Sequence, residues 1–384
     1  MTGSVADLLE GKRVCICAGS GGVGKTTTSA AIAVGMAARG HKVAVLTIDP
    51  AKRLADSLGL PELGNTEQRV DPALFESLGI DPGPGELWAM MLDAKATLDE
   101  MVRKHAPDAE SRDRILDNRI YQQLSAALAG SQEYAAMEKL FEIWAEDRYD
   151  LLVLDTPPSR QALDFLDAPQ RLTQFIEGRA LQVFMKPTGL GMKIFGRGAG
   201  VMFGVLRRIT GVNLIEDLAE FFEAFSGMVS GFRERARRVN ELLADEQTSF
   251  LVVCGPQGEP IDEAVYFHRK LVEAGFPFSG VVVNKVHYEE DLPDPDDDFE
   301  GELSRALGDH DLARRVRENF DDYRALSARD RRAVRHLARE MRTRAVIEVP
   351  YLDEDVHDLA GLMELNRYLF AAGAGERAAI AAES

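Results

Sequence analysis

Cysteine is scarce in this 384-residue chain, which contains only Cys15, Cys17 and Cys254. No two of them have CxxC spacing, which argues against a structural zinc site of the usual kind. So few cysteines in so long a chain also argue against a disulfide framework. Each cysteine lies in a short apolar run. We therefore expect all three to be small buried residues of β-strands.

Long apolar runs and positive charge are lacking as well. No segment approaches the roughly 18 uncharged apolar residues of a membrane-spanning helix, and the first residues do not resemble a signal peptide. The net charge is −18, whereas affinity for nucleic acid depends largely on lysine and arginine side chains that neutralise phosphates. We therefore expect a cytoplasmic protein with no integral membrane segment and without nucleic acid as its main partner.

The chain does contain a regular alternation of short apolar runs and helical patterns. Continuous apolar runs separated by helices are typical of a parallel sheet that helices cover on both faces. The predicted fold class is therefore α/β, with a mainly parallel sheet of the P-loop NTPase kind. Ligands of such sheets bind beyond the carboxyl ends of the strands. The strands are expected at 14–17, 43–48, 87–92, 151–154, 250–254, 280–283 and 346–349.

Two regions, 94–148 and 160–245, depart from this alternation because their patterns are helical throughout. We interpret them as one helical subdomain inserted into the α/β core. The Ala-rich end of the chain, 371–384, is expected to be a flexible tail. The core then comprises residues 1–93, 149–159 and 246–370.

A phosphate-binding pattern, GxxxxGK[ST], occupies Gly19–Thr26 between a predicted strand and a predicted helix. Its glycines allow successive N–H groups to converge on phosphate oxygens, and the N-terminus of the helix adds a partial positive charge. Lys25 is expected to bind the β- and γ-phosphates and to act in catalysis, while the Thr26 hydroxyl coordinates Mg²⁺. The predicted nucleotide contacts in this segment are Gly21, Gly22, Val23, Gly24, Lys25, Thr26 and Thr27.

Two further polar residues follow apolar runs. Asp155 is the expected second magnesium residue, which holds the ion through water. Asn284 begins a segment similar to the base-recognition motif [NT]KxD of P-loop GTPases, in which the Asp accepts two hydrogen bonds from guanine. His287 stands at that position, and a neutral imidazole cannot supply both acceptors. We therefore expect ATP rather than GTP, with Asn284 either bonding the adenine edge or simply ending a strand.

With these pieces placed, the chain resembles the deviant-Walker ATPases and, within them, the ArsA-like family of arsenite-pump and tail-anchored-protein targeting ATPases. The matching segments recur in family order across roughly residues 11–365. They read GSGGVGKTT, TIDPAKRLADSLG, LWAMMLDAKATLDE, AGSQEYAAMEKLFEI, VLDTPPSRQALDFLDAP and VPYLDEDVHDL. The resemblance implies a dimeric ATPase that uses ATP and Mg²⁺. It further implies that Asp49 orients the attacking water, although an Asp there is also a common helix cap, and that Pro350 lies beside the adenine.

Three departures from the family pattern matter. Ser20 replaces the signature lysine that reaches the partner's phosphates, a trans cation worth on the order of 10³–10⁵ in rate. A heterodimer with a lysine-bearing paralogue is therefore favoured over a homodimer. Arg160 either partly replaces that cation or is a surface arginine. The cysteines that bind arsenite or a dimer zinc in the family have no counterpart, which makes arsenite an unexpected substrate.

The segment 180–206 is rich in methionine and phenylalanine, which suits a promiscuous apolar surface. Either Met185, Met192, Phe195, Met202 and Phe203 line a groove for a hydrophobic membrane-protein client, or they form the core of the subdomain. Two function classes stay open: an ATPase that couples nucleotide state to a dimer conformational change, and a low-turnover, nucleotide-gated partner subunit. A membrane-positioning ATPase similar to MinD would need a basic amphipathic C-terminal helix, which the tail lacks.

Overall fold

The computed structural model describes residues 3–48, 53–119, 121–122, 131–156, 228–288, 299–352 and 354–383. Asp49, Arg160 and the segment 180–206 lie outside the described residues, and so does most of 160–245. The expectations for these positions stay predictions.

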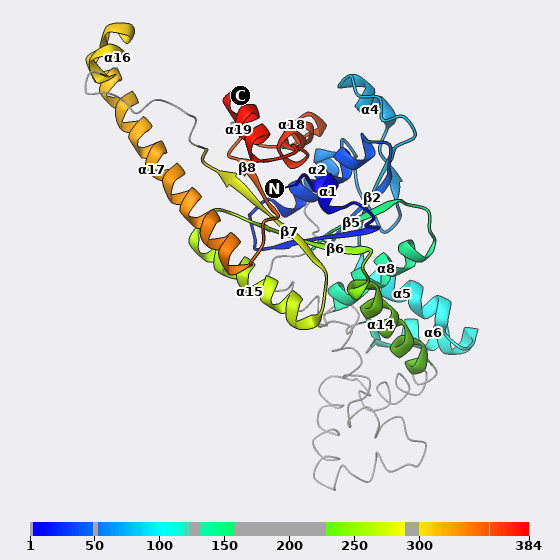
Figure 1. Cartoon of the computed structure of the whole chain (residues 1–384). Coiled ribbons are helices and arrows are strands. Elements are labelled where there is room, and N and C mark those ends of the chain that lie inside the picture. The colour runs from blue at the N-terminus through cyan, green and yellow to red at the C-terminus, as the bar shows by residue number, and fades with distance from the viewer. Residues whose placement is uncertain are drawn as a thin grey trace, which may run out of the picture.

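The centre of the molecule is an eight-stranded sheet in the order β3-β4-β2-β5-β1-β6-β7-β8 (Figure 1). Its strand pairs are parallel except for β3 with β4. The predicted α/β fold with a mainly parallel sheet is thus confirmed. The strands are β1 Val14–Gly19, β2 Lys42–Thr47, β3 Gln68–Arg69, β4 Glu86–Met91, β5 Leu151–Asp155, β6 Thr248–Cys254, β7 Phe278–Val286 and β8 Val346–Pro350.

Helices cover both faces of the sheet, because successive side chains of a strand point to opposite sides. In β1, Val14 and Ile16 belong to one buried cluster, and Cys15 and Cys17 to the other. The Cys15 face is covered by α1 Val5–Leu8, α2 Lys25–Ala37, α3 Arg53–Ser57, α4 Pro72–Ser77, α18 Leu359–Leu369 and α19 Ala374–Glu383. The Val14 face is covered by α5 Ala94–His105, α6 Ala109–Asp117, α8 Ser131–Ala145, α14 Val229–Ala244, α15 Gly258–Ala274 and α17 His310–Glu340.

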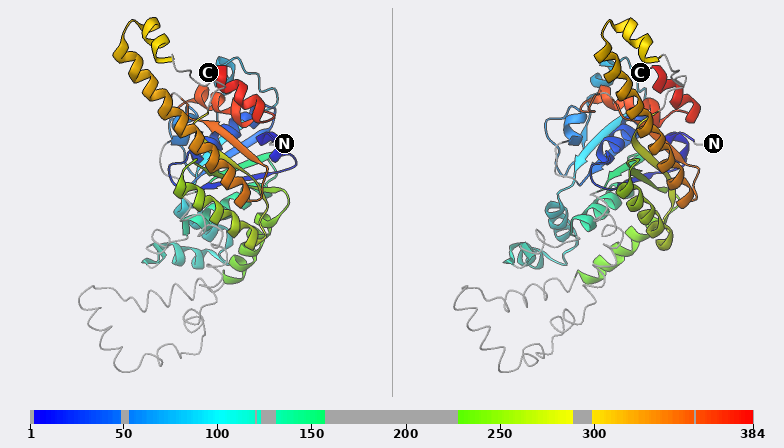
Figure 2. Two further views of the ribbon diagram at one scale, coloured as in Figure 1. Left: turned by 60° about the vertical axis from the view of Figure 1, so that its left-hand side comes forward. Right: turned by 90° about the vertical axis from the view of Figure 1, so that its left-hand side faces the viewer.

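The longest described helix is α17, with 31 residues. With α16, Phe299–Leu307, it forms a hairpin that projects from one side of the sheet (Figures 1 and 2). The half of α17 nearer the sheet buries Val334 and Leu337 in the core cluster of that face. No helix in the described ranges combines the length and the apolar character that crossing a membrane requires.

The described helices of the predicted subdomain are α5, α6, α8 and α14. They lie together on the same face of the sheet as α17, but at the other end of that face (Figure 1). A buried ion pair joins two of them. Glu138 of α8 has 1% of its side chain exposed and pairs with Arg235 of α14, which is 21% exposed. The hydroxyl of Tyr134 also donates to Glu138, at 3.4 Å. The pair fixes α14 against α8.

Arg235→Ala is therefore expected to destabilise the protein by about 3–5 kcal/mol, because it leaves the Glu138 carboxylate buried without its cation. Urea unfolding followed by circular dichroism measures the change. Arg237→Ala is the matched control on the same helix, since Arg237 is 56% exposed and its ion pairs among the described residues are with the surface residues Glu234 and Glu241. Equal midpoints for the two variants would contradict the expectation.

The end of the chain differs from the flexible tail expected for 371–384. Residues from Ala374 form α19, which packs on α18 and β8. Arg377 is 1% exposed, and its guanidinium donates to the carbonyls of Tyr368, Ala371 and Gly3. The Ala-rich composition conceals this anchor, because a single arginine supplies it.

Candidate functional site

The loop between β1 and α2 owes its path to glycine. Gly22 and Gly24 have φ of 77° and 90°, in the left-handed region that favours glycine. A Cβ on Gly24 would also lie 2.3 Å from Nδ2 of Asn284, so any other residue there would displace the Asn284 side chain. The loop leads directly into α2, whose first residue is Lys25. The N-terminus of this helix therefore directly adjoins the loop, as anion binding requires.

Lys25 is held inside the loop that precedes it. Its Nζ donates to the carbonyl of Ser20 at 2.8 Å, and only 7% of the residue is exposed. The ammonium thus sits next to the helix N-terminus in a largely dehydrated position, where a positive charge acts strongly on an anion. Ser20 contributes to this contact through its backbone, not through its side chain.

Two hydroxyls converge on one carboxylate at the carboxyl ends of the strands. The Oδ2 atom of Asp155 accepts from Oγ1 of Thr26 at 2.7 Å and from Oγ1 of Thr47 at 2.9 Å. Asp155 is 1% exposed. Magnesium prefers such oxygen donors, so Thr26 and Asp155 fit the metal residues expected from the sequence. Thr47 was not predicted, although it precedes Asp49 by two residues.

Asn284 lies near the end of β7, against the phosphate loop. Its Nδ2 donates to the carbonyl of Val23 at 2.9 Å, and its Oδ1 accepts from the N–H of Lys285 at 3.0 Å. Lys285 has φ of 63°, and the pairing of β7 with β8 shifts register between Val283 and Val286. The end of β7 is therefore irregular where Asn284 meets the phosphate loop.

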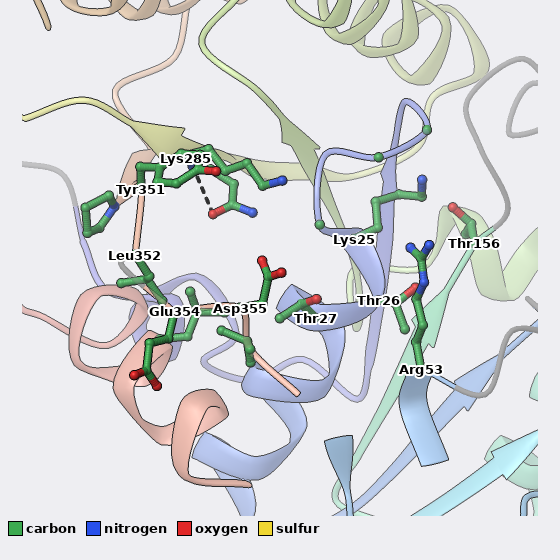
Figure 3. Close-up of a pocket in the computed structure, with 17 residues that line it drawn as sticks. Lys25, Thr26, Thr27, Arg53, Thr156, Lys285, Tyr351, Leu352, Glu354 and Asp355 are labelled. Carbon is green, nitrogen blue, oxygen red and sulfur yellow. Dashed lines mark hydrogen bonds between the residues drawn. The ribbon is translucent and has the colours of Figure 1, made fainter. Parts of the chain in front are cut away.

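A cavity of about 480 Å³ joins these parts. Figure 3 shows Lys25 and Thr26 at one end of it and Tyr351 and Leu352 at the other. The predicted residues that line it are Gly21, Gly22, Gly24, Lys25, Thr26, Thr27, Asn284 and Pro350. Val23 and Asp155 contact lining residues: the carbonyl of Val23 accepts from Asn284, and the carboxylate of Asp155 accepts from Thr26. The cavity thus extends from Lys25 to the loop after β8, and the amide of Asn284 lines it as well.

Several lining residues escaped the sequence reasoning. Arg53, Thr156 and Lys285 each lie within a segment that the sequence analysis recognised, but none of them was singled out there. The loop after β8 offered less signal, because only Pro350 was singled out in a segment that lines the cavity through Tyr351, Leu352, Glu354, Asp355 and Val356.

The cysteines take no part in this site. All three are free and buried, as predicted. Burial raises the pKa of the Cys254 thiol to about 12, and the contact with Cys17 together with burial raises the pKa of Cys15. The thiols of Cys15 and Cys254 are therefore neutral near neutral pH, unlike those of reactive or metal-binding cysteines.

Comparison with known proteins gives one family match and many relatives. The family model described as anion-transporting ATPase matches residues 12–331. The ATPase GET3 of Malassezia globosa is 27% identical over 92% of this chain and 89% of its own length. The putative arsenical pump-driving ATPase 1 of Aquifex aeolicus is 27% identical, over 72% of this chain and 64% of its own length. The ATPase ASNA1 homolog of Cryptosporidium parvum is 28% identical, over 74% of this chain and 68% of its own length.

Proposed function

Because the chain belongs to the anion-transporting (ArsA) ATPase family and is an ATPase, we propose that it binds Mg·ATP in the cavity beside Lys25 and hydrolyses it as one half of a dimer. The nucleotide state would set the conformation of that dimer. The observation that carries the proposal is the convergence of Thr26 and Thr47 on the buried carboxylate of Asp155, together with the buried ammonium of Lys25 in the adjoining phosphate loop.

Each residue has a separate task in this proposal. Lys25 and the N–H groups of the loop bind the phosphates and stabilise the charge that develops on them. Thr26 directly, and Asp155 through water, would hold Mg²⁺, which when bound supplies further positive charge beside the phosphates. Asp49 orients the attacking water. Asn284 and Pro350 contact the adenine.

The dimer partner is proposed to be a paralogue that carries the lysine missing at Ser20. In a homodimer neither site would receive a cation from across the interface. In the heterodimer the site of this chain would receive one, and hydrolysis would occur there. The same absence supports a second function, that of a low-turnover subunit whose nucleotide state gates binding of another ATPase.

Asp49→Asn separates these functions. In an ATPase that acts on a client, the variant is expected to bind ATP normally but to turn over about 10²-fold more slowly, because the water is no longer oriented. Calorimetry and phosphate release, measured with the partner present, give the two quantities. For a gating subunit, turnover of the complex would be equal in variant and wild type. Pull-downs with the variant in ATP, followed by mass spectrometry, identify the protein retained.

A hydrophobic or membrane-protein segment is the proposed client, held by residues of 180–206. Deletion of 187–206 is expected to abolish capture of a transmembrane peptide while ATP binding and the unfolding transition stay intact. Global unfolding of the deletion variant would instead identify this segment as subdomain core.

A further inference from the structure

We propose that Tyr351 is a stacking platform for the nucleotide base and that Asp330 and His287 hold it in position. This inference rests on the proposed function, since it concerns the base end of the same cavity. Asp330 would then be a positioning residue on α17, a helix that contributes no lining residue to the cavity.

The arrangement begins at Asp330, whose side chain is fully buried. One carboxylate oxygen, Oδ2, accepts from the backbone N–H of His287 at 3.1 Å and lies 2.7 Å from its Nδ1. The other, Oδ1, accepts from Nε and Nη2 of Arg329 at 3.0 and 2.9 Å. Both oxygens of a buried carboxylate are thus engaged, and the His287 backbone and ring are fixed by the same atom.

His287 in turn supports an aromatic ring of the cavity. Its imidazole stacks on Tyr351, with centroids 5.8 Å apart and planes inclined by 16°. The edge contact with Tyr323, at 5.6 Å and 75°, restrains it from another direction. The position that reads guanine in GTPases therefore serves here as a support, because the imidazole is turned toward Asp330.

Tyr351 is the member of this group that reaches the ligand space. It lines the cavity, is 60% exposed, and its N–H donates to the carbonyl of Val286 at 3.0 Å. Figure 3 places it with Lys285 at the end of the cavity remote from Lys25. An aromatic ring held rigidly and left exposed at that end suits the π-face of a base. Lys25, the proposed phosphate-binding residue, lies at the other end of the cavity, so a change at Tyr351 should not alter phosphate binding.

We expect the loss of Tyr351 to remove only the part of the binding affinity that the base contributes. Tyr351→Ala is expected to weaken ATP binding about tenfold, the contribution of one base–aromatic stack. Binding of inorganic tripolyphosphate, which has no base, should stay unchanged. Tyr351→Phe should retain wild-type affinity for both. In steady-state assays with the partner present, KM should rise while kcat stays the same, since the stack acts equally in ground and transition states.

His287→Ala tests the support without touching the cavity wall, and it should show the same selective loss, severalfold for ATP and none for tripolyphosphate. Tyr266→Ala is the matched control, because Tyr266 is 47% exposed on α15 and does not line the cavity. Titration calorimetry of the full chain with Mg²⁺ gives all affinities.

Unchanged ATP affinity in Tyr351→Ala would overturn the inference, and so would equal losses for ATP and tripolyphosphate. Wild-type protein that bound neither probe would overturn the proposed function instead.

Discussion

Ser20→Lys is expected to raise ATP hydrolysis by the chain alone by on the order of 10³-fold, the lower end of the range for a cation supplied in trans to phosphoryl transfer. In a homodimer of the variant, each subunit would provide its partner with the missing charge. Because the wild-type homodimer has no such charge at either site, its turnover should be slow.

The loop geometry favours this exchange. Ser20 binds Lys25 through its carbonyl, which every residue has, and its Oγ has no hydrogen-bond partner among the described residues. Replacing the side chain therefore removes no contact that shapes the loop. Phosphate release should rise steeply with protein concentration over the range in which the dimer forms.

Ser20→Met is the control for this experiment, since it has similar length without charge and should leave turnover unchanged. Equal acceleration by methionine would show that charge is not the cause. Rapid hydrolysis by the unmodified chain alone would refute the proposed need for a lysine-bearing partner.

Lys25→Ala should lower kcat by about 10²–10³-fold in the complex with the partner, the effect of removing one preorganised charge-stabilising group. ATP binding should weaken as well, because Lys25 provides a buried cation at the phosphate end of the cavity. Lys285→Ala is the matched control. Lys285 lines the same cavity at the other end and is exposed, so its removal should change kcat little. Identical ATP binding by Lys25→Ala and wild type would refute the phosphate-loop interpretation.

The phosphate end of the site could be predicted because its determinants are contiguous. The motif at Gly19–Thr26 predicts both the turn and the helix. Asp155 follows an apolar run, so it is expected at the same edge of the sheet as that turn. The contact between Thr26 and Asp155 then follows from β1 and β5 being neighbours.

The base end could not be predicted to the same extent, because it depends on packing between distant segments. The sequence showed only that His287 replaces the guanine-binding Asp of GTPases; it did not show that the ring of His287 contacts Asp330, 43 residues further along the chain. Nothing local marks Asp330, which stands between two arginines on a helix that looks charged and exposed. The edge strand β3 was not predicted either, because its two residues are too few to show the alternating pattern of a strand.

The shared acceptor at Asp155 has a mechanical consequence. Thr26 lies in the first turn of α2, whereas Thr47 is the last residue of β2, and both side chains donate to the same oxygen atom of Asp155. Any shift of that atom on metal exchange is thereby transmitted to two chain segments at once. If Asp155 holds the metal as proposed, gain or loss of the ion would therefore act on the start of α2 and on the end of β2 together.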